Sequence, residues 1–249
     1  LVPRGARAMV LYTTGLSVTY TGNHAIERPR ERPQGSIFRR ILRTLDEVAQ
    51  TDARVQPNRQ GMVRPVAGAA VPIEPRNGIA LRAERPTFVW YAVPGAAGYV
   101  LQLRHLASGR IERWETGRDT AWRLPPETSL ARGAEYEWTV AAVGGGRAAP
   151  VQRFRVATPA QADSVQARLM ELLRAGVDPA GEQGLFLVAL AYRDAGLFYE
   201  ARDALDRLAA AGGGNGRAFH LLRADVYDAL GRLDLAAAAL ARADAAGGG

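Results

Sequence analysis

Histidine and cysteine, the residues that most often bind metals or act as bases and nucleophiles, offer little chemistry in this sequence. The three histidines, His24, His105 and His220, fall in separate segments and lack the spacing of metal ligands. The chain contains no cysteine, which removes thiol catalysis, disulfides and cysteine-bound zinc. We therefore expect no metal and no cofactor, and we expect the histidines to lie at surfaces or interfaces.

Carboxylates are the remaining candidates for acid-base chemistry. Glu112 and Glu115 stand three positions apart, as do Asp203 and Asp206, but neither pair belongs to a catalytic motif. Solvated strand and helix faces explain these side chains better than a reaction does, so we expect that the protein is not an enzyme. A hydrolase acting on cell-wall material would need a cleft with paired acids, which the sequence does not display.

A repeat near the end of the chain predicts the elements that carry these residues. A tyrosine, a glycine four positions later and an alanine nine positions later recur after 35 residues: Tyr192, Gly196 and Ala201, then Tyr227, Gly231 and Ala236. Small residues let paired helices approach closely and glycine ends the first helix of each pair, so the pattern predicts two helical hairpins between residues 183 and 243. We expect the tyrosine rings to fill the gap between neighbouring hairpins.

A further helix is predicted before the hairpins, over residues 161–175, with Val165, Leu169, Leu172 and Leu173 along one side and Gly176 as its stop. The spacings of the hairpins resemble the tetratricopeptide repeat, although Leu185 and His220 replace its consensus tryptophan. The resemblance implies a helical domain over residues 160–246 whose concave surface could hold a partner's peptide or helix, with His220 as a candidate contact. Packing of this surface on the rest of the chain is the alternative.

Residues 84–158 alternate in the manner of a β-sandwich. Large apolar residues occupy every second position in runs separated by glycine and proline turns: Phe88 and Trp90; Tyr99, Leu101 and Leu103; Tyr136, Trp138 and Val140; Phe154 and Val156. Residues 85–103 and 124–143 resemble fibronectin type III and related immunoglobulin-like modules, which implies a spacer or adhesive domain. Trp114 and Trp122 could stack on sugars, but we expect them to pack on the sheets.

Residues 27–83 are rich in proline and glycine and are predicted to be a linker. Within it, residues 36–49 have the spacing of an amphipathic helix that carries Arg39, Arg40 and Arg43 opposite its apolar side. Two roles are open for this helix. It could dock on an anionic membrane or an acidic partner, with the three arginines as contacts, or it could pack on its own domain with solvated arginines.

Residues 1–26 are predicted to be a small β fragment, in which residues 8–13 and 16–20 form strands around a turn at Thr14 and Gly15. This fragment resembles the end of the small β domain of FecR-like envelope proteins, which implies an extracytoplasmic setting. Its first five residues, LVPRG, fit both a thrombin-site remnant of a vector and native sequence.

No stretch of the sequence reaches the ~20 apolar residues that cross a bilayer, and a targeting segment could precede Leu1.

The charge of the chain favours protein or lipid partners. All 32 basic residues are arginine, the net charge is +7, and the acids outnumber the arginines only after residue 159. A basic surface can meet an acidic protein, an anionic lipid or a nucleic acid. Interleaved acids such as Glu27, Glu31, Asp46 and Glu47 disfavour nucleic acid.

The sequence thus predicts a multidomain α+β chain in which a fibronectin- or immunoglobulin-like sandwich precedes a tetratricopeptide-like helical array, with a β fragment and a linker helix in front. We expect a non-catalytic scaffold or accessory subunit that contacts other proteins, such as subunits of a membrane-associated complex. Its expected location is the periplasmic or extracytoplasmic face of a bacterial envelope. The alternative is a FecR-like sensor or ligand-binding module at the same place.

Overall fold

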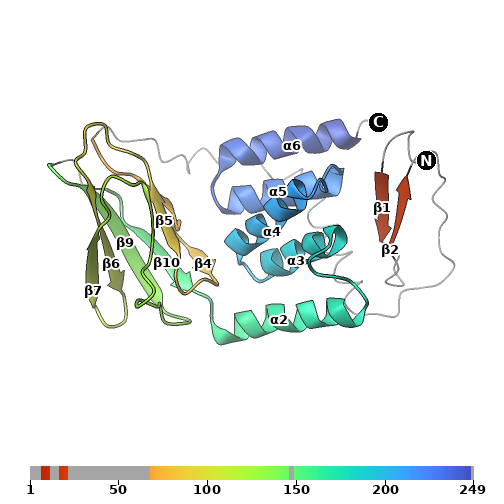
Figure 1. Cartoon of the computed structure of the whole chain (residues 1–249), viewed down its shortest axis with the longest axis horizontal. Coiled ribbons are helices and arrows are strands. Elements are labelled where there is room, and N and C mark those ends of the chain that lie inside the picture. Colours follow the sequence, from red (N-terminus) through yellow and green to blue (C-terminus); the bar gives the residue numbers. More distant parts are fainter. Residues whose placement is uncertain (1–6, 12–16, 22–67, 146–148, 248–249) are drawn as a thin grey trace.

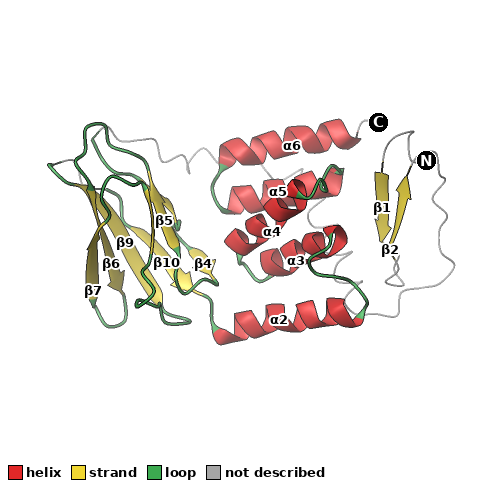
Figure 2. Ribbon diagram, viewed as in Figure 1, coloured by secondary structure: helices red, strands yellow, loops and turns green. Residues whose placement is uncertain are grey.

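A computed structural model describes residues 7–11, 17–21, 68–145 and 149–247 (Figures 1 and 2). The predicted helix over residues 36–49, with Arg39, Arg40 and Arg43, lies outside these ranges, as do residues 1–5 and His24. Near the N-terminus, β1 (Arg7–Leu11) pairs with β2 (Ser17–Thr21) in antiparallel register. This hairpin falls within the predicted β fragment.

Two sheets form a β-sandwich in the middle of the chain (Figure 2). Within the described ranges, one sheet has the strand order β4-β10-β9-β6-β7 and the other the order β3-β5-β8. The pairing is antiparallel except between β4 and β10, which are parallel. The strands are β3 (Pro72–Glu74), β4 (Ile79–Leu81), β5 (Thr87–Trp90), β6 (Tyr99–His105), β7 (Ile111–Glu115), β8 (Ala121–Arg123), β9 (Glu135–Ala142) and β10 (Gln152–Val156).

The alternating apolar residues of the sequence meet between the two sheets, and every member of the four predicted runs is buried. Phe88 lies at the centre, with its ring centroid 5.0 Å from that of Trp138 and 6.0 Å from that of Phe154. Edge-to-face arrangements of this kind add to the free energy gained by burying the rings. The period-two alternation is confirmed as the inward face of the sandwich.

The sandwich extends further towards the N-terminus than the composition of residues 27–83 suggested. Strand β3 pairs with β5 and strand β4 with β10, so residues 72–81 belong to the sheets and not to a linker. The three residues of β4 are all buried because it lies between the sandwich and the helices. A strand covered on both faces shows no alternation, and Pro72, Pro75 and Gly78 around these short strands resemble a loop.

Five helices follow within the described part of the chain: α2 (Pro159–Arg174), α3 (Glu182–Asp194), α4 (Phe198–Ala210), α5 (Arg217–Ala229) and α6 (Leu233–Gly247). Helix α2 begins three residues after β10, and none of the five is long and apolar enough to span a membrane. Val165 and Leu172 are buried as expected, but Leu173, predicted on the same side of α2, is half-exposed.

Helices α3 and α4 form one hairpin and α5 and α6 form the next (Figure 1). Gly196 and Gly231 occupy the turns of the two hairpins, with φ angles of +72° and +68° that favour glycine. Ala201 and Ala236 are almost completely buried in the second helix of each pair, where a larger side chain would separate the helices. The residues that repeat in sequence therefore take equivalent places in the structure.

Candidate functional site: the cleft between sandwich and helices

The turns of the two hairpins face the edge of the sandwich that carries β4 (Figure 1). A small apolar cluster joins the two domains, with Ala80 of β4 and Ala157 after β10 packed on Val165 of α2 and Leu197 before α4. All four side chains are buried. The β-sandwich and the helical domain therefore share buried surface in addition to the short connection between β10 and α2.

Arg76, in the turn between β3 and β4, reaches both hairpins. Its backbone N–H donates to the hydroxyl of Tyr199 at 3.2 Å, and its Nη1 donates to the carbonyl of Leu230 at 3.2 Å. Leu230 is the residue that ends α5, where unpaired carbonyls and the helix dipole favour a cation. A β-carbon on Gly231 would overlap the Arg76 guanidinium, so the glycine makes room for this contact.

Arg82, just after β4, forms a second bridge to the helices. Its backbone N–H donates to Oε1 of Glu200 at 2.7 Å, and its Nη1 donates to the hydroxyl of Tyr192 at 2.9 Å. Tyr192 was predicted to fill the gap between the hairpins. Its hydroxyl contacts the sandwich, because Tyr192 lies in the last turn of α3, which faces that domain.

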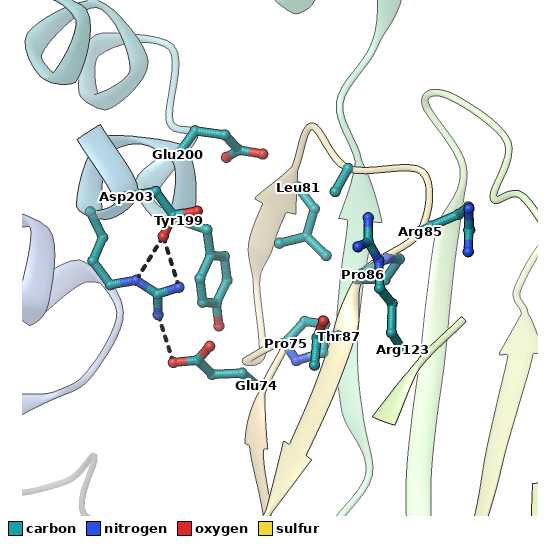
Figure 3. Close-up of a pocket in the computed structure, with 12 residues that line it drawn as sticks. Glu74, Pro75, Leu81, Arg85, Pro86, Thr87, Arg123, Tyr199, Glu200 and Asp203 are labelled. Carbon is teal, nitrogen blue, oxygen red and sulfur yellow. Dashed lines mark hydrogen bonds and ion pairs between the residues drawn. The ribbon is translucent and has the colours of Figure 1, made fainter. Parts of the chain in front are cut away.

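A cleft of about 230 Å³ opens beside these bridges, between helix α4 and the three-stranded sheet (Figure 3). Residues of both domains line it: Glu74, Pro75, Leu81, Ala83, Arg85, Pro86, Thr87, Arg123, Tyr199, Glu200, Arg202 and Asp203. The sandwich supplies one wall of the cleft, with apolar and basic side chains. The first two turns of α4 supply the opposite wall. The cleft thus exists only because the two domains are joined.

Arg202 organises the helical wall of the cleft. Its Nη1 lies 2.9 Å from Oε1 of Glu74 across the cleft, its Nη2 lies 3.1 Å from Oδ1 of Asp203, and its guanidinium lies 5.1 Å from the ring centroid of Tyr199 (Figure 3). Burial would lower the pKa of Arg202, but the two carboxylates outweigh it and hold that pKa above its usual value. Burial and the charge of Glu74 raise the pKa of Tyr199, which stays neutral.

Glu200, in the first turn of α4, is a third acid of the cleft. Burial raises the pKa of its carboxyl group, against the lowering effect of backbone hydrogen bonds that include the one from Arg82. Its Oε2 is buried and has no hydrogen-bond partner within the described part of the chain.

The two arginines on the sandwich side of the cleft are not paired with carboxylates, unlike the arginine on the helical side. Arg85 is oriented by hydrogen bonds from Nε and Nη2 to the carbonyl of Leu124, at 3.3 and 3.1 Å, and it has no carboxylate partner in the described ranges. The side chain of Arg123 is exposed and forms no hydrogen bond or ion pair with any other described residue. The cleft therefore has two guanidinium groups whose charge is not neutralised by these residues.

Most of the charged side chains in the cleft are held by their neighbours. Glu74 and Asp203 are paired with Arg202, and one oxygen of Glu200 is held by the backbone of Arg82. Among the described residues no group of histidines and acids could hold a metal ion. No serine, histidine or cysteine lines the cleft to act as a nucleophile or base.

His220, a candidate partner contact, does not lie in the cleft. It is half-buried in α5, with its ring centroid 5.2 Å from that of Phe219. Burial and the nearby charges of Arg242 and Arg223 lower its pKa, so the ring is neutral. His105 is the last residue of β6, and its Nδ1 accepts from the backbone N–H of Ser108 in the following turn at 3.1 Å.

The other residues considered for chemistry are held in ordinary structural contacts. Asp206 pairs with Arg223 at 3.0 Å, and Glu112 with Arg110 at 3.1 Å. The rings of Trp114 and Trp122, on β7 and β8, lie 5.1 Å apart and pack on the core where the edges of the two sheets meet. The expectation that these tryptophans pack on the sheets agrees with this geometry.

Sequence patterns missed most of the cleft. Tyr192 and Gly231 were found as repeat positions, but Arg76, Arg82 and Glu200 carry no motif. The sequence signal for this part of the cleft was the apolar triplet Ile79–Leu81, which lies between Arg76 and Arg82 and forms a short buried strand.

Comparison with known proteins gives no family for this chain. No family model matches it, and no curated protein shows significant similarity. Solved structures that resemble part of it include one described as "Myokine structure", at 13% identity and a TM-score of 0.29, covering 36% of this chain and 98% of that one. Another is an Fn3-like protein from Clostridium thermocellum, at 21% identity and a TM-score of 0.27, covering 36% of this chain and 95% of that one.

Proposed function

We propose that this protein is a non-catalytic scaffold or accessory subunit that holds partner proteins in a membrane-associated assembly of the bacterial envelope. The observation that carries the proposal is the interface between the sandwich and the helical hairpins. Arg76 and Arg82 tie both hairpins to the sandwich and leave a shaped cleft beside them. A binding site preformed in this way loses little conformational entropy when a partner is bound.

The helical part supports this interpretation through its resemblance to tetratricopeptide repeats, whose hairpins stack to form binding surfaces. Gly196 and Gly231 in the turns, and the buried Ala201 and Ala236, are the positions on which the resemblance rests. The sandwich supports it through its fibronectin-like sequence pattern, since such modules commonly act as spacers. The proposed envelope location rests on the FecR-like pattern of the N-terminal hairpin.

The proposal is tested by purifying the full-length protein from its native membranes at moderate salt and weighing the intact assembly by native mass spectrometry. We expect one or more other proteins at fixed stoichiometry. A protein that is always recovered alone, under conditions in which other envelope complexes stay intact, would contradict the proposal.

A FecR-like sensor or ligand-binding module is the second candidate function, and the hairpin of β1 and β2 is the observation that favours it. A sensor would bind its signalling partner or surface polymer reversibly, without stoichiometric co-purification. Crosslinking in intact cells with and without the signal distinguishes the two, because a scaffold keeps its partners in both conditions.

A further inference from the structure

We propose that the cleft between α4 and the three-stranded sheet binds an acidic peptide segment of a partner protein, with a carboxylate of that segment held by the guanidinium of Arg123. This inference rests on the proposed scaffold function and specifies the chemistry of one partner contact. The unpaired charges of the cleft and the apolar residues beside them define the chemistry of this segment.

The charges of the cleft leave a positive excess on the sandwich side. Glu74 and Asp203 share Arg202, whereas Arg85 and Arg123 have no carboxylate partner in the described ranges. A guanidinium group is planar and can donate two parallel hydrogen bonds to one carboxylate. An acidic side chain or a C-terminal carboxylate therefore complements this wall.

The outer face of the three-stranded sheet carries Arg123 beside Thr87. Arg123 of β8 lies directly opposite Thr87 of β5, so the two side chains project from the same face. Arg85 comes two residues before the start of β5 and also lines the cleft. Pro75, Leu81 and Pro86 provide apolar surface next to them (Figure 3). A peptide in extended conformation has the same two-residue period and can place acidic and apolar side chains on such a surface.

Acidic side chains line the cleft beside the basic wall. The carboxylates of Glu74, Glu200 and Asp203 would repel the continuous phosphates of a nucleic acid. The mixed walls thus favour a peptide with separated acids over a polyanion.

The test uses the full-length protein and a fluorescent hexapeptide that alternates glutamate with alanine, with the glutamine counterpart as the matched probe. Binding is followed by fluorescence anisotropy at low and moderate salt. We expect the glutamate probe to bind at least about tenfold more tightly than the glutamine probe, because only the carboxylate is attracted to the arginines. Equal binding of the two probes, or no binding of the glutamate probe up to millimolar concentration, would overturn the proposal.

Two charge reversals locate the contact. Arg123→Glu should weaken binding of the glutamate probe about tenfold or more, and Arg123→Ala should weaken it less. Arg118→Glu is the matched control, because Arg118 is also an exposed arginine of the sandwich but does not line the cleft, and it should leave binding unchanged. Equal losses from Arg123→Glu and Arg118→Glu would show a diffuse charge effect and reject the site.

Further outcomes separate this inference from the proposed function and from other ligands. If the wild-type protein keeps its partners in native mass spectrometry but does not bind the glutamate probe, the cleft proposal is wrong and the scaffold function stands. If the wild-type protein is always recovered alone but the probe binds with the expected dependence on Arg123, the scaffold function fails and the site stands. A single-stranded oligonucleotide that binds more tightly than the glutamate probe and depends on Arg123 would identify a nucleic-acid site instead.

Discussion

Gly231 shows how a single missing side chain shapes the interface between the domains. Its φ of +68° is costly for other residues, and its open face accommodates the guanidinium of Arg76. We expect Gly231→Ala to lower the free energy of unfolding by about 2 kcal/mol, roughly half from the left-handed backbone and half from the lost Arg76 hydrogen bond to Leu230. Urea unfolding followed by circular dichroism measures this change.

The equivalent turn of the first hairpin supplies the control. Gly196 has a φ of +72°, but a β-carbon there would meet no atom within 4 Å. Gly196→Ala should therefore lower the free energy of unfolding by only about 1 kcal/mol, which is the contribution of the left-handed backbone. If the two variants lose the same stability, Arg76 contributes nothing measurable to the interface.

Glu200 is expected to make stability depend on pH. Burial raises the pKa of its carboxyl group in the folded protein above the value in the unfolded chain. The folded state therefore holds this proton to higher pH, and the resulting stability is complete below the unfolded pKa and is lost as pH rises through the folded one. Glu200→Gln removes this loss of stability at higher pH and keeps a side-chain oxygen that can accept the hydrogen bond from the backbone N–H of Arg82.

The comparison is made by measuring urea midpoints of wild type and Glu200→Gln from about pH 4 to pH 7.5, a window that starts near the ordinary pKa of glutamate. We expect the variant to gain relative to wild type as pH rises, by an amount on the order of 1 kcal/mol or less. A constant difference across the window would show that Glu200 does not carry the effect.

At the scale of elements, the N-terminus of α2 fixes the path from the sandwich into the helices. The hydroxyl of Thr158 accepts from the backbone N–H of Gln161 at 3.2 Å, and the backbone N–H of Thr158 donates to Oε1 of Gln161 at 3.1 Å. This capping box satisfies two groups that the first turn of a helix otherwise leaves unpaired. Thr158→Ala is expected to cost about 1 kcal/mol of stability.

Ser164→Ala is the matched variant for thermal unfolding of the same helix. Ser164 is exposed in the interior of α2, where alanine has the higher helix propensity. It should leave the midpoint unchanged or raise it slightly, while Thr158→Ala lowers it. A loss of the same size in both variants would indicate a general effect of substitution in α2 and argue against the cap.

Elements with a regular period could be predicted from the sequence, and elements defined by tertiary contact could not. The alternation of Tyr136, Trp138 and Val140 and the repeat of Tyr192 at Tyr227 report local geometry directly. Strand β4 has three residues and pairs in parallel with β10, far away in sequence, so its existence depends on the assembled sandwich. Helix α2 buries Val165 and Leu172, but the buried face is narrower than the apolar side read from the sequence, so Leu173 is exposed.

The candidate site was less predictable than the fold for a related reason. Its polar residues lie on β3, on α4 and in loops, more than 100 residues apart in sequence, as between Arg76 and Tyr199. In a chain whose basic residues are all arginine, Arg85 and Arg123 do not stand out by composition. The side chains of the two walls of the cleft come together only when the hairpins dock on the sandwich.

At the scale of the whole molecule, the shared interface predicts that sandwich and helices unfold together. All four tryptophans, Trp90, Trp114, Trp122 and Trp138, belong to the sandwich, so tryptophan fluorescence reports that domain. Circular dichroism at 222 nm reports mainly the helices. Because the two domains share a buried apolar cluster and the bridges of Arg76 and Arg82, we expect the two thermal transitions to coincide within error.

Weakening the interface should separate the two transitions. The double variant Arg76→Ala and Arg202→Ala removes the hydrogen bond to Leu230 and the ion pair to Glu74, and leaves the apolar core of each domain unchanged. The loss is expected to be about 2 to 4 kcal/mol, the sum of one hydrogen bond and one partly buried pair. The less stable domain then melts first, and the fluorescence and dichroism midpoints differ. Midpoints that still coincide would show that the apolar cluster and the remaining bridge of Arg82 couple the domains without the side chains of Arg76 and Arg202.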